Sequence, residues 1–366
     1  MKTYIKPLAL LLSLVLAASL FAGCAKTETP AAPAEPAPAP AEPAPAPEAK
    51  PSEEPAPAPE TEPETEPEPA AQPETVPAEE DEEDEENYET GDASLDDPLN
   101  QDGIGEDELL VVSFGTSFND SRRLTIGAIE KAMIDAFPDW SVRRGFTSQI
   151  IIDHVRSRDG EVIDNMTEAL DRAVDNGVKR LVVQPTHLMD GLEYNDVVNE
   201  VAQYADAFTS IQIGKPILST DEDFSAVADA MVECTKEYDD GKTAICWMGH
   251  GTEADSNSVY EKMQTVLTDK GCQNYFVGTV EAAPTVEDVL AMVKAGDYER
   301  VVLRPMMIVA GDHANNDMAG DEEGTWKNLF EAEGYEVLTE LQGLGELPAI
   351  QALLVSHAQA AVAEAG

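Results

Sequence analysis

Apolar and polar residues alternate along residues 109–363 in two patterns, one typical of buried strands and one of amphipathic helices. Short apolar runs between turn residues predict strands at 109–114, 181–184, 211–218, 243–248, 275–280, 301–308 and 336–338. Apolar residues three or four positions apart predict helices at 119–136, 161–176, 194–208, 224–238, 259–268, 286–294 and 347–363. This alternation predicts an α/β fold whose parallel sheets are covered by helices on both faces.

The two halves of this region resemble each other. Residues 178–185 match 298–305, and residues 191–195 align without gaps on 311–315, which sets Glu193 opposite His313. Residues 113–116 match 249–252, and residues 146–147 fall near 280–281. A duplicated βαβ unit explains these matches. It predicts two similar Rossmann-like or flavodoxin-like domains, at 109–240 and 241–366, with a cleft between them that is formed by equivalent strand ends.

Residues 1–24 have the pattern of an export signal. Lys2 and Lys6 precede an apolar run at 8–20, which is followed by Phe21, Ala22, Gly23 and Cys24. The run is too short to span a membrane comfortably. The pattern resembles a bacterial lipoprotein signal, in which Cys24 is lipidated and anchors the protein at the cell surface or in the periplasm. An ordinary secretory signal is the alternative, and both predict an exported protein.

Residues 25–108 consist mainly of Pro, Ala and Glu and include an acidic run at 79–86. They contain few residues that can build a core, which predicts a disordered, extended linker. An alternative is that the acidic run binds cations or a basic partner.

The charge of the chain restricts its partners. The formal net charge is −49, and about half of it belongs to residues 109–366. This charge argues against nucleic acid or an anionic membrane surface as a partner. A polyanionic substrate would need a local basic patch, for which the candidates are Arg122, Arg123, Arg143, Arg144, Arg304 and Lys327.

Cys234, Cys246 and Cys272 lack the paired spacing of a zinc or iron–sulfur site. An exported protein can contain a disulfide, and the sequence leaves the pairing open.

Polar residues suited to metal binding follow three predicted strands of the second half. His250 lies between two glycines after the strand at 243–248, Glu281 follows the strand at 275–280, and His313 follows the strand at 301–308. Ligands of open α/β sheets bind at such strand ends. Two imidazoles and a carboxylate suit a divalent first-row metal with open coordination positions. Glu193 is predicted to face them from the first half, and His187 to orient Glu193 or line the cleft.

The alternative for each histidine is a hydrogen-bonded structural role, which is the commoner one for a lone histidine at a strand end. Two glycine-flanked histidines in one half of a duplicated fold favour a site. His154 is predicted to lie at the surface, and His357, on the last helix, to have no chemical role.

Several segments then carry a family resemblance, in order along the chain: residues 113–117, 146–148, His187 with 191–194, 248–251, 280–281, 309–319, 326–327 and 343–346. Together they resemble the anaerobic sirohydrochlorin cobaltochelatase family, and the block at 309–319 is highly specific. The resemblance implies a class II chelatase fold with a tetrapyrrole cleft between the domains. It also implies that His250 is the proton acceptor and a metal ligand, that His313 is a second ligand, and that Glu193 and Glu281 belong to the site.

The resemblance implies an enzyme of anaerobic cobalamin biosynthesis that inserts Co²⁺ into sirohydrochlorin and releases two protons. Co²⁺ is then a substrate, Fe²⁺, Ni²⁺ or Zn²⁺ are alternatives, and no organic cofactor is needed. A neutral imidazole can bind a metal or accept a proton. Arginines such as Arg143, Arg144 and Arg304, with His187, would bind the substrate carboxylates.

Export suggests an alternative function, because cobalamin ring synthesis is cytoplasmic. An exported lipoprotein could bind haem, another tetrapyrrole or a metal in the same cleft without turnover. The oligomeric state is left open.

Overall fold

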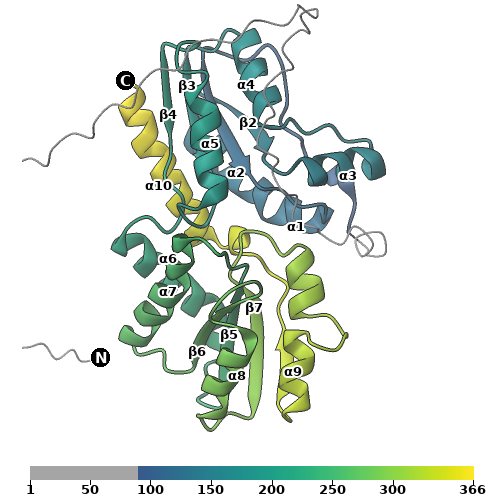
Figure 1. Ribbon diagram of the computed structural model, residues 1–366. Helices are drawn as coiled ribbons and strands as arrows, with labels where there is room; N and C mark the ends of the chain where they lie inside the picture. Colours follow the sequence, from purple (N-terminus) through teal and green to yellow (C-terminus); the bar gives the residue numbers. More distant parts are fainter. Residues whose placement is uncertain (1–89) are drawn as a thin grey trace, which may run out of the picture. The chain divides into compact units, whose positions relative to one another are not determined.

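The structure is a computed structural model that describes residues 90–366, and these residues contain two four-stranded sheets (Figure 1). The first sheet has the order β2-β1-β3-β4 and the second β6-β5-β7-β8, and every strand pair is parallel. The predicted α/β class with parallel sheets is therefore confirmed. The strands are β1 (Asp107–Ser113), β2 (Ser141–Phe146), β3 (Arg180–Pro185), β4 (Ser210–Ile213), β5 (Thr243–Gly249), β6 (Tyr275–Thr279), β7 (Arg300–Pro305) and β8 (Glu336–Thr339).

Helices follow most strands and cover both sheets. They are α1 (Asn119–Leu124), α2 (Ile126–Ala136), α3 (Gln149–Asp159), α4 (Met166–Asp175), α5 (Leu192–Ala202), α6 (Asp221–Thr235), α7 (Ser258–Asp269), α8 (Val286–Lys294), α9 (Trp326–Ala332) and α10 (Pro348–Ala365). Alternate residues of β1 point to opposite faces, as in any strand. Leu109 and Val111 pack in a core with residues of α2, whereas Leu110 and Val112 pack in a core with residues of α4 and α5.

The duplication is visible in corresponding hydrogen bonds. Asn195 donates its side-chain amide to the Gly191 carbonyl at 2.7 Å, and Asn315 donates to the Gly311 carbonyl at 2.7 Å. This places Glu193 and His313 at equivalent positions, as the sequence alignment has them.

The alignment of residues 146–147 on residues 280–281 is shifted by one residue in the structure. The Ser148 N–H donates to the Phe114 carbonyl as the Glu281 N–H donates to the His250 carbonyl. Ser148, rather than Thr147, is therefore the counterpart of Glu281, and Phe114 is the counterpart of His250.

The two sheets divide near residue 240, where the domain boundary is predicted, but the helices do not follow this division. α10, from the end of the chain, packs against β3, β4 and α2 of the first half, and α6 packs against α7 of the second (Figure 1). One continuous apolar core accordingly contains Val182, Trp247 and Leu354. The halves are thus joined by shared packing as well as by the chain.

His357 contributes to this joint. Its ring contacts the Lys215 carbonyl at 3.1 Å and an Asp223 carboxylate oxygen at 3.2 Å, which links α10 to α6. The residue is 9% exposed. His357 therefore has a structural role and no contact with the site described below.

Several elements differ from the sequence prediction, and α3 and α9 are absent from the predicted helices. β2 is absent from the predicted strands because its central side chains, Arg143 and Arg144, are charged. The helix predicted at 119–136 is interrupted at Thr125, which separates α1 from α2. The strand predicted at 211–218 ends at Ile213, before Gly214. None of the helices within residues 90–366 is both long and apolar enough to cross a membrane.

The predicted signal peptide, the predicted lipidation site Cys24 and residues 25–89 of the predicted linker lie outside the described residues. Residues 90–108, also assigned to the linker, pack on the first half. The Asp96 side chain, 3% exposed, forms ion pairs with Arg122 and Arg144 at 2.7 Å each. The predicted linker boundary at residue 108 is therefore wrong: β1 begins at Asp107, and ordered contacts begin before it.

We predict that Asp96→Ala lowers the free energy of unfolding by about 3 kcal/mol, because it leaves two buried guanidinium groups without one of their partners. Burial alone would raise the pKa of Asp96, but hydrogen bonds from Arg144 and Arg122 and their charges hold it below its ordinary value. The contribution is therefore complete above pH about 4 and disappears as the pH falls through the lower pKa of the folded state.

Denaturant titrations of the two proteins measure this difference. Glu106→Ala is the matched control, because Glu106 pairs with Lys179 on the exposed surface of the same segment. The control should change stability by less than about 1 kcal/mol. Equal losses in both variants would show that the segment is not held by Asp96.

Candidate metal centre

Three side chains from separate strand ends converge on one point. One ligand atom from each of His250, Glu281 and His313 lies within 4.8 Å of the other two. The two imidazole rings are 4.6 Å apart between centroids and stand at 83° to each other. We call these three residues the metal centre. The ligand atoms are close enough for one ion to lie between the two rings and the carboxylate.

Glycines on both sides determine where His250 lies. At Gly249 a Cβ atom would come within 2.1 Å of the Tyr260 ring. Gly251 has φ of 93°, and a Cβ there would lie 2.8 Å from the Ala282 nitrogen. Only glycine therefore fits either position without displacing its neighbours. The Glu281 N–H donates to the His250 carbonyl at 2.9 Å, which fixes these two residues side by side.

The hydrogen bonds of the rings select the nitrogen that is free to bind a metal. Nδ1 of His250 lies 2.8 Å from the Gly251 carbonyl, and Nδ1 of His313 lies 2.7 Å from an Asp317 carboxylate oxygen. Each acceptor requires the proton to be on Nδ1, which leaves the Nε2 lone pair for an ion.

The surroundings of His313 also change its basicity. Burial would lower its pKa, but the hydrogen bond to Asp317 and the charges of Asp317, Asp312 and Glu281 together raise it above the ordinary value. Protons and a divalent cation therefore compete for this ring.

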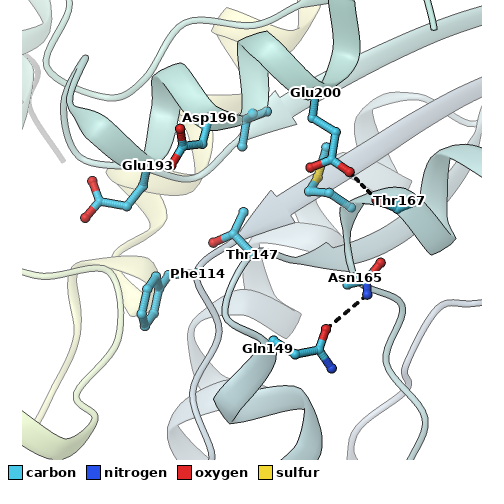
Figure 2. Close-up of a pocket in the computed structure, with 10 residues that line it drawn as sticks. Phe114, Thr147, Gln149, Asn165, Thr167, Glu193, Asp196 and Glu200 are labelled. Atoms are coloured by element: carbon cyan, nitrogen blue, oxygen red, sulfur yellow. Dashed lines mark hydrogen bonds between the residues drawn. The ribbon is translucent and has the colours of Figure 1, made fainter. Parts of the chain in front are cut away.

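A cavity of about 370 Å³ lies at the carboxyl edge of the first sheet (Figure 2). Figure 2 shows Glu193, Asp196 and Glu200 along one side of α5, with Phe114 and Thr147 opposite them. Although the predicted cleft draws on both halves, the ten residues that line this cavity all come from the first: Phe114, Thr147, Gln149, Asn165, Met166, Thr167, Glu193, Asp196, Val197 and Glu200.

Glu193 is not one of the three converging side chains, but it lies close to the turn that carries His250. Burial raises the pKa of Tyr260 to about 12, and the charge of Glu193 adds to this effect. The Tyr260 hydroxyl in turn accepts a hydrogen bond from the Gly251 N–H at 3.3 Å. The charge of Glu193, from the first half, therefore acts on Tyr260, whose hydroxyl contacts the turn that carries His250.

His187 is not one of the converging side chains. Both of its ring nitrogens are buried and have no hydrogen-bond partner among the described residues. Burial lowers its pKa to about 4, against the opposing charge of Glu193. The ring is therefore neutral at physiological pH.

Comparison with known proteins identifies the family. The family model described as cobalt chelatase (CbiK) matches residues 107–363. The chain belongs to this family. It is 36% identical over 249 residues to a sirohydrochlorin cobaltochelatase of Salmonella typhimurium, covering 68% of this chain and 94% of the relative. It is 28% identical over 267 residues to sirohydrochlorin cobaltochelatase CbiKC of Nitratidesulfovibrio vulgaris, covering 72% and 92%.

A solved structure supports the fold assignment. SirB from Bacillus subtilis with Fe³⁺ aligns with a TM-score of 0.51 at 13% identity, over 71% of this chain and 97% of SirB. This likeness concerns the fold, and the predicted class II chelatase fold is confirmed by it.

In this member of the cobalt chelatase family, the arginines predicted to bind substrate are in the core. Arg143 is fully buried and donates to Glu108 at 2.7 and 2.9 Å. Arg144 is fully buried and pairs with Glu130 at 2.6 Å as well as with Asp96. Their predicted contact with substrate is therefore wrong, because both belong to the interior of β2 and are occupied by buried carboxylates.

Arg304 is also unavailable to a substrate. It is 2% exposed, stacks on Trp247 at 5.4 Å and donates to the Gln342 side chain at 2.5 Å. The remaining candidates are paired too: Arg122 with Asp96 and Glu161 in the interior, Arg123 with Asp120, and Lys327 with Asp321. The basic patch predicted for a polyanionic substrate is not formed by these residues.

Two residues near the site, Asp317 and Phe114, are not among the site residues predicted from the sequence. Asp317 contacts His313 four residues away, a spacing that would have signalled the pair had a helical turn been predicted there. Phe114 is 43% exposed at the position equivalent to His250, and the alignment of the two halves already pointed to it.

We predict that Gly251→Ala weakens Co²⁺ binding at least about tenfold, as changes that disturb the orientation of a ligand do. The new Cβ would meet the Ala282 nitrogen and the Thr279 side chain and displace the His250 turn. Calorimetric titration with Co²⁺ measures the effect.

The control is Gly271→Ala. Gly271 also has positive φ, 88°, but no atom lies within 4 Å of a Cβ there. Both variants share the backbone strain, so only the first should lose affinity. Similar affinities in the two variants would count against the role of Gly251.

Proposed function

We propose that this protein is a sirohydrochlorin cobaltochelatase, which inserts Co²⁺ into sirohydrochlorin. The observation that carries this proposal is the convergence of His250, Glu281 and His313 at the carboxyl edge of a sheet, in a chain that belongs to the cobalt chelatase family. Two curated relatives bear the name of this activity. Imidazole and carboxylate donors suit Co²⁺, and they also suit Fe²⁺, Ni²⁺ and Zn²⁺.

The reaction exchanges one divalent cation for the two pyrrole protons of the macrocycle, so the site must release a metal and accept protons. Three protein donors hold the cation and leave coordination positions for the incoming pyrrole nitrogens. His250 is suited to accept a proton once its Nε2 releases the cation, because a neutral imidazole is an efficient base near pH 7. Glu193 supplies a second carboxylate nearby for the other proton.

Access also favours this reaction. His250 and Glu281 are exposed and His313 is partly exposed, so that a large planar molecule can approach the cation. Phe114 offers an exposed apolar ring at the equivalent edge of the first sheet. An apolar ring and an open metal centre suit a tetrapyrrole better than a small hydrated substrate.

We predict that the purified protein consumes sirohydrochlorin and Co²⁺ with loss of the absorption bands of the free base. His250→Ala should lower kcat by a factor of about 10²–10⁴, the usual contribution of general acid–base catalysis, with the loss of a metal ligand in addition. His154→Ala on α3 is the control and should retain full activity.

The same assay tests the alternative of a binding protein. No acceleration over the uncatalysed rate, together with tight retention of haem or sirohydrochlorin, would replace the enzyme assignment by binding without turnover.

We propose further that the protein is exported and anchored to a membrane by lipid on Cys24. The support is the order of Lys2 and Lys6, the apolar run at 8–20, and Cys24 after two small residues. The Pro-, Ala- and Glu-rich residues 25–89 would then act as an extended tether for the chelatase. Export places the physiological tetrapyrrole outside the cytoplasm.

We predict that Cys24→Ser moves the protein from the membrane fraction to the soluble exported fraction and abolishes incorporation of labelled fatty acid. Cys234→Ser, which changes a cysteine of the folded part, should have neither effect. Labelled fatty acid in the Cys24→Ser protein would contradict the proposed anchor.

A further inference from the structure

The two imidazoles of the metal centre differ in the group that accepts a hydrogen bond from their Nδ1. The Nδ1–H of His250 donates to a neutral carbonyl, that of Gly251, whereas the Nδ1–H of His313 donates to the carboxylate of Asp317. A carboxylate makes the stronger hydrogen bond and leaves the opposite nitrogen a better metal ligand than a carbonyl does. The two histidines are therefore unequal ligands.

The duplication provides an internal comparison for Asp317. Because Glu193 corresponds to His313, the residue four positions later in the first half is Val197. Val197 is 1% exposed and packs in the core of α4 and α5. The Asp317 side chain is instead 43% exposed. The half that has a histidine at this position thus carries a carboxylate where the other half carries a core residue.

The turn around His313 is held in place without Asp317. Asn315 donates to the Gly311 carbonyl at 2.7 Å, and Asn316 donates to Asp312 at 2.6 Å. Ala314 and Met318 are fully buried in the core of the second sheet. The residues at 314–318 form a π-helical turn, a feature often found at functional sites. The Asp317 carboxylate is therefore free to orient the His313 ring, and the backbone does not depend on it.

We propose that Asp317 is a positioning residue that directs Nε2 of His313 toward the cation, so that His313 retains Co²⁺ while His250 gives up its place on the metal. The part of this assignment that concerns turnover rests on the proposed function. The part that concerns Co²⁺ binding does not.

Co²⁺ titration without tetrapyrrole tests the binding role. Asp317→Asn keeps the size of the side chain and removes its charge, and Asp317→Val introduces the residue of the first half. Both should weaken Co²⁺ binding by about tenfold or more and shift the visible absorption of the bound ion. Asp317→Glu should restore part of the affinity. The control Asp321→Asn removes the same charge from an exposed pair with Lys327 and should leave affinity within about twofold.

A double-mutant cycle separates positioning from the general attraction of a negative charge. If Asp317 acts through His313, Asp317→Asn causes no further loss of Co²⁺ affinity in a His313→Ala background. An equal loss in that background, or wild-type affinity of Asp317→Asn alone, would overturn the proposal. In the metal-free protein at alkaline pH, where the imidazoles are neutral, nitrogen NMR should show the Nδ1–H form of His313. Asp317→Val should show a mixture of tautomers, and a spectrum identical to that of the wild type would also overturn the proposal.

The turnover assay distinguishes the two proposals. A protein that does not metallate sirohydrochlorin but loses Co²⁺ affinity as described would refute the proposed function and support the role of Asp317. Normal turnover, together with Co²⁺ affinity that substitution of Asp317 leaves unchanged, would support the proposed function and refute the role of Asp317.

Discussion

The metal centre depends on backbone hydrogen bonds made just beyond the ends of two neighbouring parallel strands. The Val280 N–H donates to the Gly249 carbonyl at 3.0 Å and the Glu281 N–H to the His250 carbonyl at 2.9 Å, which extends the pairing of β5 and β6. Parallel strands bring their carboxyl ends to one edge, so residues distant in sequence become neighbours. His313 reaches the same edge after β7, the other neighbour of β5.

The same backbone frame serves different purposes in the two halves. Where the second half has His250, Glu281 and His313, the corresponding residues of the first are Phe114, Ser148 and Glu193. The first half thus keeps the geometry without the nitrogen donors. It presents an exposed aromatic ring and a set of carboxylates on α5 (Figure 2). The candidate metal ligands therefore lie in one half, and the other half carries an aromatic ring and carboxylates at the equivalent edge of its sheet.

The sequence predicted the parts of the structure that depend on apolar periodicity and on strand ends. Seven of the strands, the duplication and the three converging residues follow from these signals. β2 could not be recognised, because Arg143 and Arg144 occupy positions where a strand interior is normally apolar. Their partners, Glu108 and Glu130, lie on other elements. A single sequence does not show which charged side chains will pair in the core. For the same reason these arginines were predicted to bind the substrate carboxylates.

The position of α10 affects how the chain can fold. α10 (Pro348–Ala365) covers a face of the first sheet, and it is made after all the residues of that sheet. Until these residues emerge, that face of β3 and β4 is exposed to water, and the first half cannot complete its own core. Folding of the first half therefore depends on a helix that follows both sheets in the chain, and removal of α10 would destabilise the half that lies farther from it in sequence.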